Sequence, residues 1–176
     1  MASLQSLTLD APAPTFTLND LEGRVWSLEA LRGKIVVLYF WSAECAWCQR
    51  TDRVLVHLAE SWGDEVVLLP IASIYEETPE MLRQAASERN LPRILHDADQ
   101  SVARRYAVQT TPHCFVIDRM GLLRYQGAFD DVTFRQRTAT RYYVDEAVRA
   151  LLSDKQPEIR ETPAYGCALT YHESNA

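Results

Sequence analysis

The chain has 176 residues, of which 47% are hydrophobic, and a formal net charge of -6. This length and composition are typical of one domain with a packed core. Because the net charge is negative and the basic residues are scattered, we expect neither nucleic acid nor an anionic membrane surface as a partner. The N-terminus lacks a charged start followed by an apolar stretch, and no segment approaches the roughly 20 apolar residues of a membrane span. We therefore expect a cytoplasmic protein, periplasmic or secreted only if a signal peptide has been removed.

The first elements are expected to be a hairpin and then a strand and helix. Residues 11–28 carry apolar and polar side chains in alternation on either side of a turn at 20–23, which predicts an N-terminal β-hairpin. Residues 35–41, IVVLYFW, are all apolar and rich in β-branched and aromatic side chains, as in a central strand covered on both faces. Residues 45–62 then carry apolar side chains at helical spacing.

A second strand and helix follow in the same order. Residues 65–73 predict another buried strand, and Thr78 with Pro79 predicts the start of a helix. Such a crossover indicates a parallel strand pair. The remaining predicted elements are a short helix at 101–106, strands at 114–118 and 122–129, and a last helix at 134–152. These elements indicate an α/β sandwich around a mixed sheet, formed by residues 1–153, with residues 154–176 as a tail that packs on the domain.

Two of the four cysteines, Cys45 and Cys48, stand in a CxxC motif between the first buried strand and the following helix. The free N-H groups and the dipole at a helix N-terminus stabilise a thiolate, which favours Cys45 as the nucleophile. Cys48 lies one turn further into the helix, where it can attack a mixed disulfide formed at Cys45. A structural zinc site would need a second pair of ligands, and the sequence contains none.

Two blocks of the sequence resemble the TlpA-type and redoxin (AhpC/TSA-related) members of the thioredoxin-like superfamily. The first is APAPTFTLNDLEGRVWSLEALRGKIVVLYFWSAECAWC, and the second is LHDADQSVARRYAVQTTPHCFVID. Together they cover most of residues 10–130. The resemblance implies a thioredoxin-like α/β/α sandwich with a central mixed β-sheet and an N-terminal β-hairpin extension.

The resemblance also implies roles for individual residues. Cys45 would be the attacking thiolate and Cys48 the resolving thiol. Pro112 would be a cis proline that faces this pair, and Thr111 before it would offer backbone groups to an extended substrate. Trp47, inside the motif, is expected to be partly exposed and able to contact substrate.

The implied activity is that of a thiol-disulfide oxidoreductase acting on protein or small-molecule disulfides, with no metal or organic cofactor. The electron donor stays open, and a thioredoxin- or glutathione-type system is a candidate. One alternative is a thiol peroxidase of the peroxiredoxin type, although Ser42 stands where the threonine of that pattern belongs and Leu38 where its shielding proline belongs. The other alternative is a non-catalytic interaction module.

One departure from thioredoxin concerns the base that helps to deprotonate the second cysteine. Thioredoxin has a buried aspartate two residues before the tryptophan that precedes the motif, and this chain has Tyr39 there. The base is therefore missing or relocated. Glu44, Glu76 and Glu77 are the candidates to replace it.

Three further residues are candidates for a redox or tuning role. Cys114, two residues beyond Pro112, either packs in a strand or reacts with the pair. Cys167 is a third redox thiol if the tail folds over the site, and a packed or idle cysteine if it does not. His113 either tunes the thiolate of Cys45 or is a solvent-facing imidazole.

Overall fold

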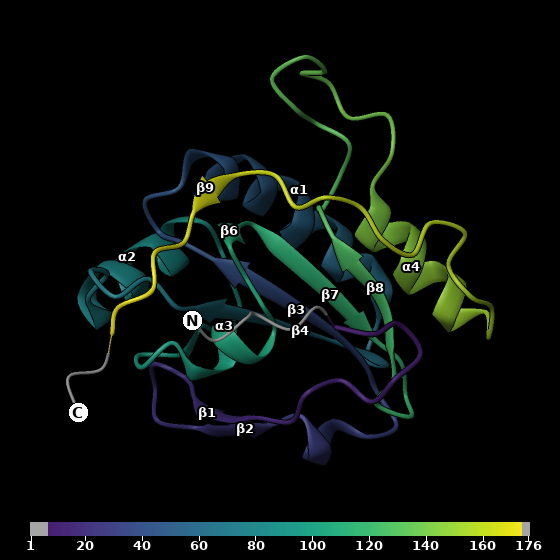
Figure 1. Cartoon of the computed structure of the whole chain (residues 1–176), viewed down its shortest axis with the longest axis horizontal. Helices are drawn as coiled ribbons and strands as arrows, with labels where there is room; N and C mark the ends of the chain where they lie inside the picture. The colour runs from purple at the N-terminus through teal and green to yellow at the C-terminus, as the bar shows by residue number, and fades with distance from the viewer. Residues whose placement is uncertain (1–6, 174–176) are drawn as a thin grey trace.

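A five-stranded mixed sheet forms the centre of the computed structural model, which describes residues 7–173. The strand order is β5-β4-β3-β7-β8 (Figure 1). β4 pairs parallel with both β3 and β5, β7 pairs antiparallel with β3, and β8 pairs antiparallel with β7. The strands of this sheet are β3 (Ile35–Trp41), β4 (Val66–Ala72), β5 (Leu95–His96), β7 (His113–Ile117) and β8 (Leu123–Gly127). The mixed sheet predicted from the order of the elements is confirmed.

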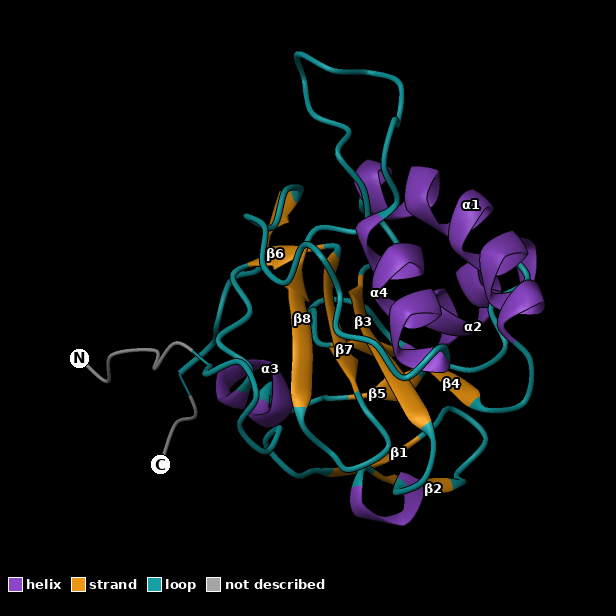
Figure 2. Ribbon diagram, turned by 90° about the vertical axis from the view of Figure 1, so that its right-hand side faces the viewer, coloured by secondary structure: helices purple, strands orange, loops and turns teal. Residues whose placement is uncertain are grey.

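Helices cover both faces of the sheet. Figure 2 shows α1, α2 and α4 on one side and α3 on the other, with the β1-β2 hairpin below. The helices are α1 (Ala46–Trp62), α2 (Pro79–Glu88), α3 (Ser101–Arg105), α4 (Tyr143–Leu152) and the 3-10 turn η1 (Glu29–Leu31), and the hairpin strands are β1 (Thr17–Asn19) and β2 (Val25–Ser27). The predicted α/β/α sandwich with its N-terminal hairpin is therefore present. Within residues 7–173, none of the helices has the length and apolar character needed to cross a membrane.

The core lies in two layers because successive side chains of β3 point to opposite faces of the sheet. Tyr39 and Trp41 belong to the layer under α1, α2 and α4. Val36, Leu38 and Phe40 belong to the layer under α3 and the hairpin. All seven side chains of β3 are buried. A strand covered on both faces needs a continuous apolar run, as the sequence predicted.

The predicted helix at 134–152 is wrong in its first half. Only α4, which starts at Tyr143, is helical, and residues 130–142 form a loop that protrudes from the domain (Figure 1). The carboxylate of Asp131 accepts hydrogen bonds from the backbone N-H groups of Thr140 (2.9 Å) and Arg141 (3.2 Å). These backbone N-H groups therefore close the loop instead of a helical turn. The side chain of Phe134 is 72% exposed and lies outside the core.

Two short strands complete the fold beside the motif. β6 (Thr110–Thr111) pairs antiparallel with β9 (Cys167–Ala168), which belongs to the C-terminal segment. In Figure 1 this segment passes over the end of the sheet near β6. Residues 174–176 of the predicted tail lie outside the described residues. The Thr111-Pro112 peptide bond between β6 and β7 is cis, as expected from the resemblance.

Candidate active site

The first cysteine of the motif occupies the N-cap of α1. Cys45 has an extended backbone, and its carbonyl accepts the first helical hydrogen bond from the N-H of Gln49 (3.0 Å). Glu77 fixes the loop before it, because its carboxylate accepts hydrogen bonds from Ser42 Oγ (2.5 Å) and Ala43 N (3.1 Å). The helix N-terminus predicted for Cys45 is therefore confirmed, and Glu77 supports the loop rather than acting as the missing base.

The C-terminal segment covers Cys45. A disulfide joins Cys45 to Cys167, whose Cα atoms are 6.2 Å apart across a sequence separation of 122 residues. In the β6-β9 ladder Cys167 lies opposite Thr111. The exposed fraction of Cys45 is only 3% in this arrangement. The tail therefore folds over the site. This is the arrangement in which Cys167 was expected to be a third redox thiol.

Cys48 is a free thiol and is wholly buried beneath Cys45. Burial, with a smaller contribution from the charge of Asp52, raises the pKa of Cys48 to about 12. Hydrogen bonds from the Ser42 backbone, Thr111 and Tyr39 act in the opposite direction because they favour the thiolate. The thiol is therefore held protonated and shielded from solvent while Cys45 is bonded elsewhere.

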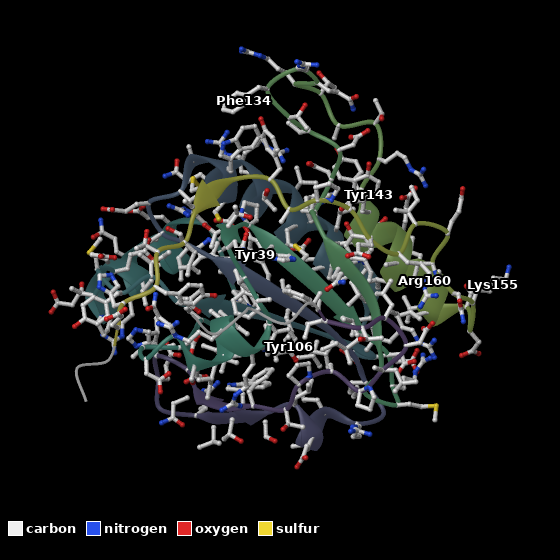
Figure 3. All side chains as sticks on the ribbon, viewed as in Figure 1. Tyr39, Tyr106, Phe134, Tyr143, Lys155 and Arg160 are labelled. Carbon is white, nitrogen blue, oxygen red and sulfur yellow. A yellow bond between two sulfur atoms is a disulfide. The ribbon has the colours of Figure 1, made fainter. Side chains whose placement is uncertain are left out.

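A buried carboxylate lies one helical turn beyond Cys48. Asp52, 0% exposed, accepts hydrogen bonds from Tyr39 Oη (2.8 Å) and Trp41 Nε1 (2.9 Å) and pairs with Arg89 Nη1 (3.1 Å). Burial raises the pKa of Asp52, and the three hydrogen bonds limit the rise. Tyr39, which Figure 3 places inside the molecule, also contacts the carbonyl of Cys48 at 3.4 Å.

Asp52 is not among the residues predicted from the sequence. Tyr39, standing where thioredoxin has its aspartate, suggested the glutamates of neighbouring loops as the base, yet its hydroxyl donates to a carboxylate on α1. One signal was available, because Asp52 lies four residues after Cys48 and on the same helical face as Leu55. A charged side chain on a buried stripe needs a partner, and that need marks it as a candidate for function.

Thr111 and Pro112 border the motif as the resemblance implied. Cys45 Sγ lies 3.4 Å from the carbonyl oxygen of Thr111, and both Thr111 and Pro112 are buried. Since β6 is otherwise an edge, its backbone groups are available to a paired strand. In this structure β9 takes that place.

Trp47 is half-buried and belongs to an aromatic cluster beside Cys45. Its ring packs edge-to-face against Phe134 (5.4 Å between centroids) and Tyr165 (5.0 Å). Phe134 comes from the protruding loop (Figure 3) and Tyr165 from the tail. The guanidinium of Arg50 lies over the Trp47 ring, 5.8 Å from its centroid. Sequence reasoning found Trp47 but neither of its aromatic partners, which come from segments remote in the chain.

His113 and Cys114 point to opposite faces of β7. The His113 ring stacks on Phe115 with centroids 4.4 Å apart, and burial lowers the pKa of His113 to about 4. The ring is half-buried and lies with Phe115 on the α3 side of the sheet, whereas Cys45 belongs to the other layer. Cys114 lies opposite Tyr39 in the β3-β7 ladder, is wholly buried, and has a pKa raised by burial. Among residues 7–173, no group of three or more His, Cys, Asp or Glu side chains is arranged to hold a metal ion.

Comparisons with known proteins agree with this geometry. The chain is 30% identical over 122 residues to the thiol-disulfide oxidoreductase ResA of Geobacillus thermodenitrificans, covering 68% of each chain. It is similar over nearly its whole length to the structure of a hypothetical protein from Sinorhizobium meliloti 1021, with a TM-score of 0.87, 27% identity, and coverage of 97% of this chain and 98% of that one. A secreted disulfide oxidoreductase of Mycobacterium tuberculosis, homologous to DsbE of E. coli, matches with a TM-score of 0.56 and 28% identity over 61% of this chain and 79% of its own.

A CxxC motif at a helix N-terminus, beside Thr111-Pro112 on a thioredoxin-like sheet, defines the class of thioredoxin-like thiol-disulfide oxidoreductases. A model of the AhpC/TSA family matches residues 9–126, which is more than half of the chain. The chain belongs to the AhpC/TSA family.

Proposed function

We propose that this protein reduces or exchanges disulfides in extended protein segments, with Cys45 as nucleophile and Cys48 as resolving thiol. The observation that carries the proposal is the position of Cys45 at the N-cap of α1, with its Sγ 3.4 Å from the Thr111 carbonyl at a strand edge. A segment that pairs with β6 brings its disulfide to Cys45. Trp47 adds an aromatic surface beside the same edge.

The chemistry has two steps. The Cys45 thiolate attacks one sulfur of the substrate disulfide, a Cys45-substrate bond forms, and the other substrate sulfur leaves as a thiolate that takes up a proton. Cys48 then loses its proton and attacks Cys45 Sγ, so that a Cys45-Cys48 disulfide forms and the second substrate thiol leaves. In this scheme Asp52 accepts the proton of Cys48 by way of the Tyr39 hydroxyl, which contacts the Cys48 carbonyl and donates a hydrogen bond to Asp52.

The peroxidase alternative draws less support from the site. Leu38, which stands where the shielding proline of that pattern belongs, is a buried residue inside β3. The hydroxyl of Ser42, which stands where the threonine belongs, donates to Glu77. Neither side chain is therefore placed to shape a peroxide pocket at Cys45. The thioredoxin-type reaction needs neither residue.

Insulin reduction with dithiothreitol as the thiol donor tests the proposal. We expect turnover by the wild type, none by Cys45→Ser, and accumulation of insulin-linked protein by Cys48→Ser on a non-reducing gel. The adduct should persist because the second step has lost its thiol. Turnover of hydrogen peroxide by Cys48→Ser, together with no reduction of insulin by the wild type, would instead establish the peroxidase.

The proposal extends to the electron donor and to the cellular compartment of the protein. A thioredoxin- or glutathione-type donor would reduce the oxidised site by thiol-disulfide exchange. The cytoplasmic location expected from the sequence gains no support from the comparisons, because the similar oxidoreductase of M. tuberculosis is described as secreted. Fractionation of cells that express the complete gene, with an antibody against the protein, decides the compartment.

A further inference from the structure

The C-terminal segment occupies the strand edge at which an extended substrate is expected. β9 pairs antiparallel with β6, and the N-H of Leu169 continues the ladder by donating to the carbonyl of Gln109 (2.8 Å). Cys167 lies opposite Thr111 and is bonded to Cys45. These are the contacts that a substrate strand makes when its cysteine forms a mixed disulfide with the nucleophile. The tail therefore has the geometry of a bound substrate.

The residue before Cys167 is adapted to this edge. A Cβ atom at Gly166 would collide with the carbonyl oxygen of Thr111 and lie 2.9 Å from Pro112 Cδ. Only glycine allows the backbone of the tail to approach so closely. On either side of the Gly-Cys pair, Tyr165 contacts Trp47 and the buried Leu169 packs in the layer under α3. The segment thus presents an aromatic residue, glycine, cysteine, one exposed residue and a leucine in order.

The tail is also fastened on both sides of this segment. Before it, the N-H of Thr162 donates to the carbonyl of Gln126 (3.1 Å). After it, the side chain of Gln100 donates to the carbonyl of Thr170 (2.9 Å) and accepts from the N-H of His172 (2.9 Å). A thiol released from Cys45 therefore stays close to it, at a high effective concentration.

We propose that residues 165–169 are an internal substrate, which competes with external protein segments for the β6 edge and exchanges Cys167 for their cysteine at Cys45. The proposal rests on the function proposed above. In the exchange, the Cys48 thiolate attacks Cys45 Sγ, the Cys45-Cys167 bond breaks, and a Cys45-Cys48 bond forms. Cys167 leaves as a thiolate and takes up a proton, so no net oxidation or reduction occurs.

In the Cys45-Cys167 disulfide, Cys167 is the sulfur within reach of solvent. Cys167 is half-buried, whereas Cys45 and the free thiols Cys48 and Cys114 are buried. An external reductant therefore attacks Cys167 Sγ, so that a reductant-Cys167 bond forms, the Cys45-Cys167 bond breaks and Cys45 leaves as a thiolate. A second thiol of the reductant then displaces Cys167, which frees the tail as a thiol and leaves the reductant oxidised to a disulfide. The external substrate that then binds is expected to match the tail it replaces, with glycine before its cysteine and an aromatic residue before the glycine.

Disulfide mapping of the full-length protein tests the internal substrate. Trypsin cleavage places Cys45 and Cys48 together in peptide 35–50 and Cys167 in peptide 161–176. After oxidation with oxidised glutathione and blocking of free thiols with N-ethylmaleimide, the wild type should give these two peptides linked. Gly166→Ala should shift the bond into peptide 35–50, as a Cys45-Cys48 disulfide, because the added methyl group displaces β9 from Thr111. The control Ala168→Ser, at an exposed position of β9, should give the wild-type map.

Peptide substrates give a second measurement that does not depend on the folding of Gly166→Ala. The disulfide-linked dimers of the peptides YGCALTY and YACALTY are incubated with Cys48→Ser/Cys167→Ser, and adducts on Cys45 are followed by mass spectrometry. The glycine peptide should react about tenfold faster, because the methyl group of the alanine peptide would collide with the Thr111 carbonyl. The variant that also carries Cys45→Ser should form no adduct.

The outcomes separate the inference from the proposed function. Equal rates for the two peptides, or a wild-type map that shows only Cys45-Cys48, would overturn the internal substrate while insulin reduction continued. A Gly166→Ala map identical to that of the wild type would do the same. Failure of the wild type to reduce insulin, with no adduct from either peptide, would overturn the proposed function as well.

Discussion

The two faces of β3 differ in what lies against them. Val36, Leu38 and Phe40 contact an apolar layer in which shape and burial are the main requirements. On the other face Tyr39 and Trp41 donate hydrogen bonds to Asp52, a charged group inside the core. A buried carboxylate is retained against its desolvation cost only where donors surround it. On the face that carries Cys48, a buried carboxylate therefore bonds directly to side chains of β3, one helical turn from Cys48.

The largest expected effect comes from removing the carboxylate. Asp52→Ala leaves Arg89, Tyr39 and Trp41 without their acceptor, and breaking a buried ion pair typically costs about 3 to 5 kcal/mol. We expect a loss of this size in the free energy of unfolding, measured by urea titration. Asp52→Leu/Arg89→Met removes both charges and should cost clearly less than the sum of its two single variants. Additive losses within about 0.5 kcal/mol would show that the pair is not coupled.

On the α3 side of the sheet, burial suppresses the ionisation of His113. Burial lowers the pKa of His113 to about 4, so the unfolded chain binds a proton near pH 6.5 and the folded chain does not. Stability should therefore fall as the pH drops from 6.5 to 4, by up to about 3 kcal/mol from this group. His113→Leu, compared with the wild type by urea titration at pH 7 and pH 4.5, should lose less stability over this interval. Equal pH dependence of the two proteins would contradict the assignment.

The features that the sequence predicted correctly are those that depend on local signals. The continuous apolar run of residues 35–41 and the helical spacing of residues 45–62 are local signals, and both elements form as expected. The position of Cys45 follows from the same signals. The relation of Thr111 and Pro112 to the motif came from the resemblance, since it depends on how remote segments meet.

The features that the sequence did not predict depend on partners remote in the chain. Asp52 is identifiable as a charged residue on a buried helix stripe, but its donor Arg89 lies 37 positions away. Phe134 would fit an amphipathic helix, yet it contacts Tyr165 of the tail. Cysteine connectivity cannot be deduced from sequence alone, and Cys167 acquires its partner only when the tail crosses the site.

Removing one tyrosine hydroxyl from each face of the sheet compares the two faces through a smaller change. Tyr39→Phe removes the donor to Asp52, and Tyr106→Phe removes the donor to the Pro14 carbonyl (2.6 Å) on the other side of the sheet. Each should cost about 1 kcal/mol of stability, the net value of one hydrogen bond. Only Tyr39→Phe should also slow insulin reduction, by about fivefold, because the hydroxyl between Cys48 and Asp52 is lost. Similar activity of the two variants would remove Tyr39 from the proton path.

The smallest effect is expected for the second buried thiol on the Cys48 face. Cys114 lies opposite Tyr39 in the β3-β7 ladder, and burial raises the pKa of Cys114, so the group stays a protonated thiol that fills space. Cys114→Ala should therefore cost about 1 kcal/mol, the value of one small buried group, and leave insulin reduction unchanged. Cys114→Ser should cost more, because the hydroxyl is buried among apolar side chains. A fall in turnover of Cys114→Ala at unchanged folding, or a Cys48-Cys114 disulfide in the oxidised wild type, would instead make Cys114 a fourth redox cysteine.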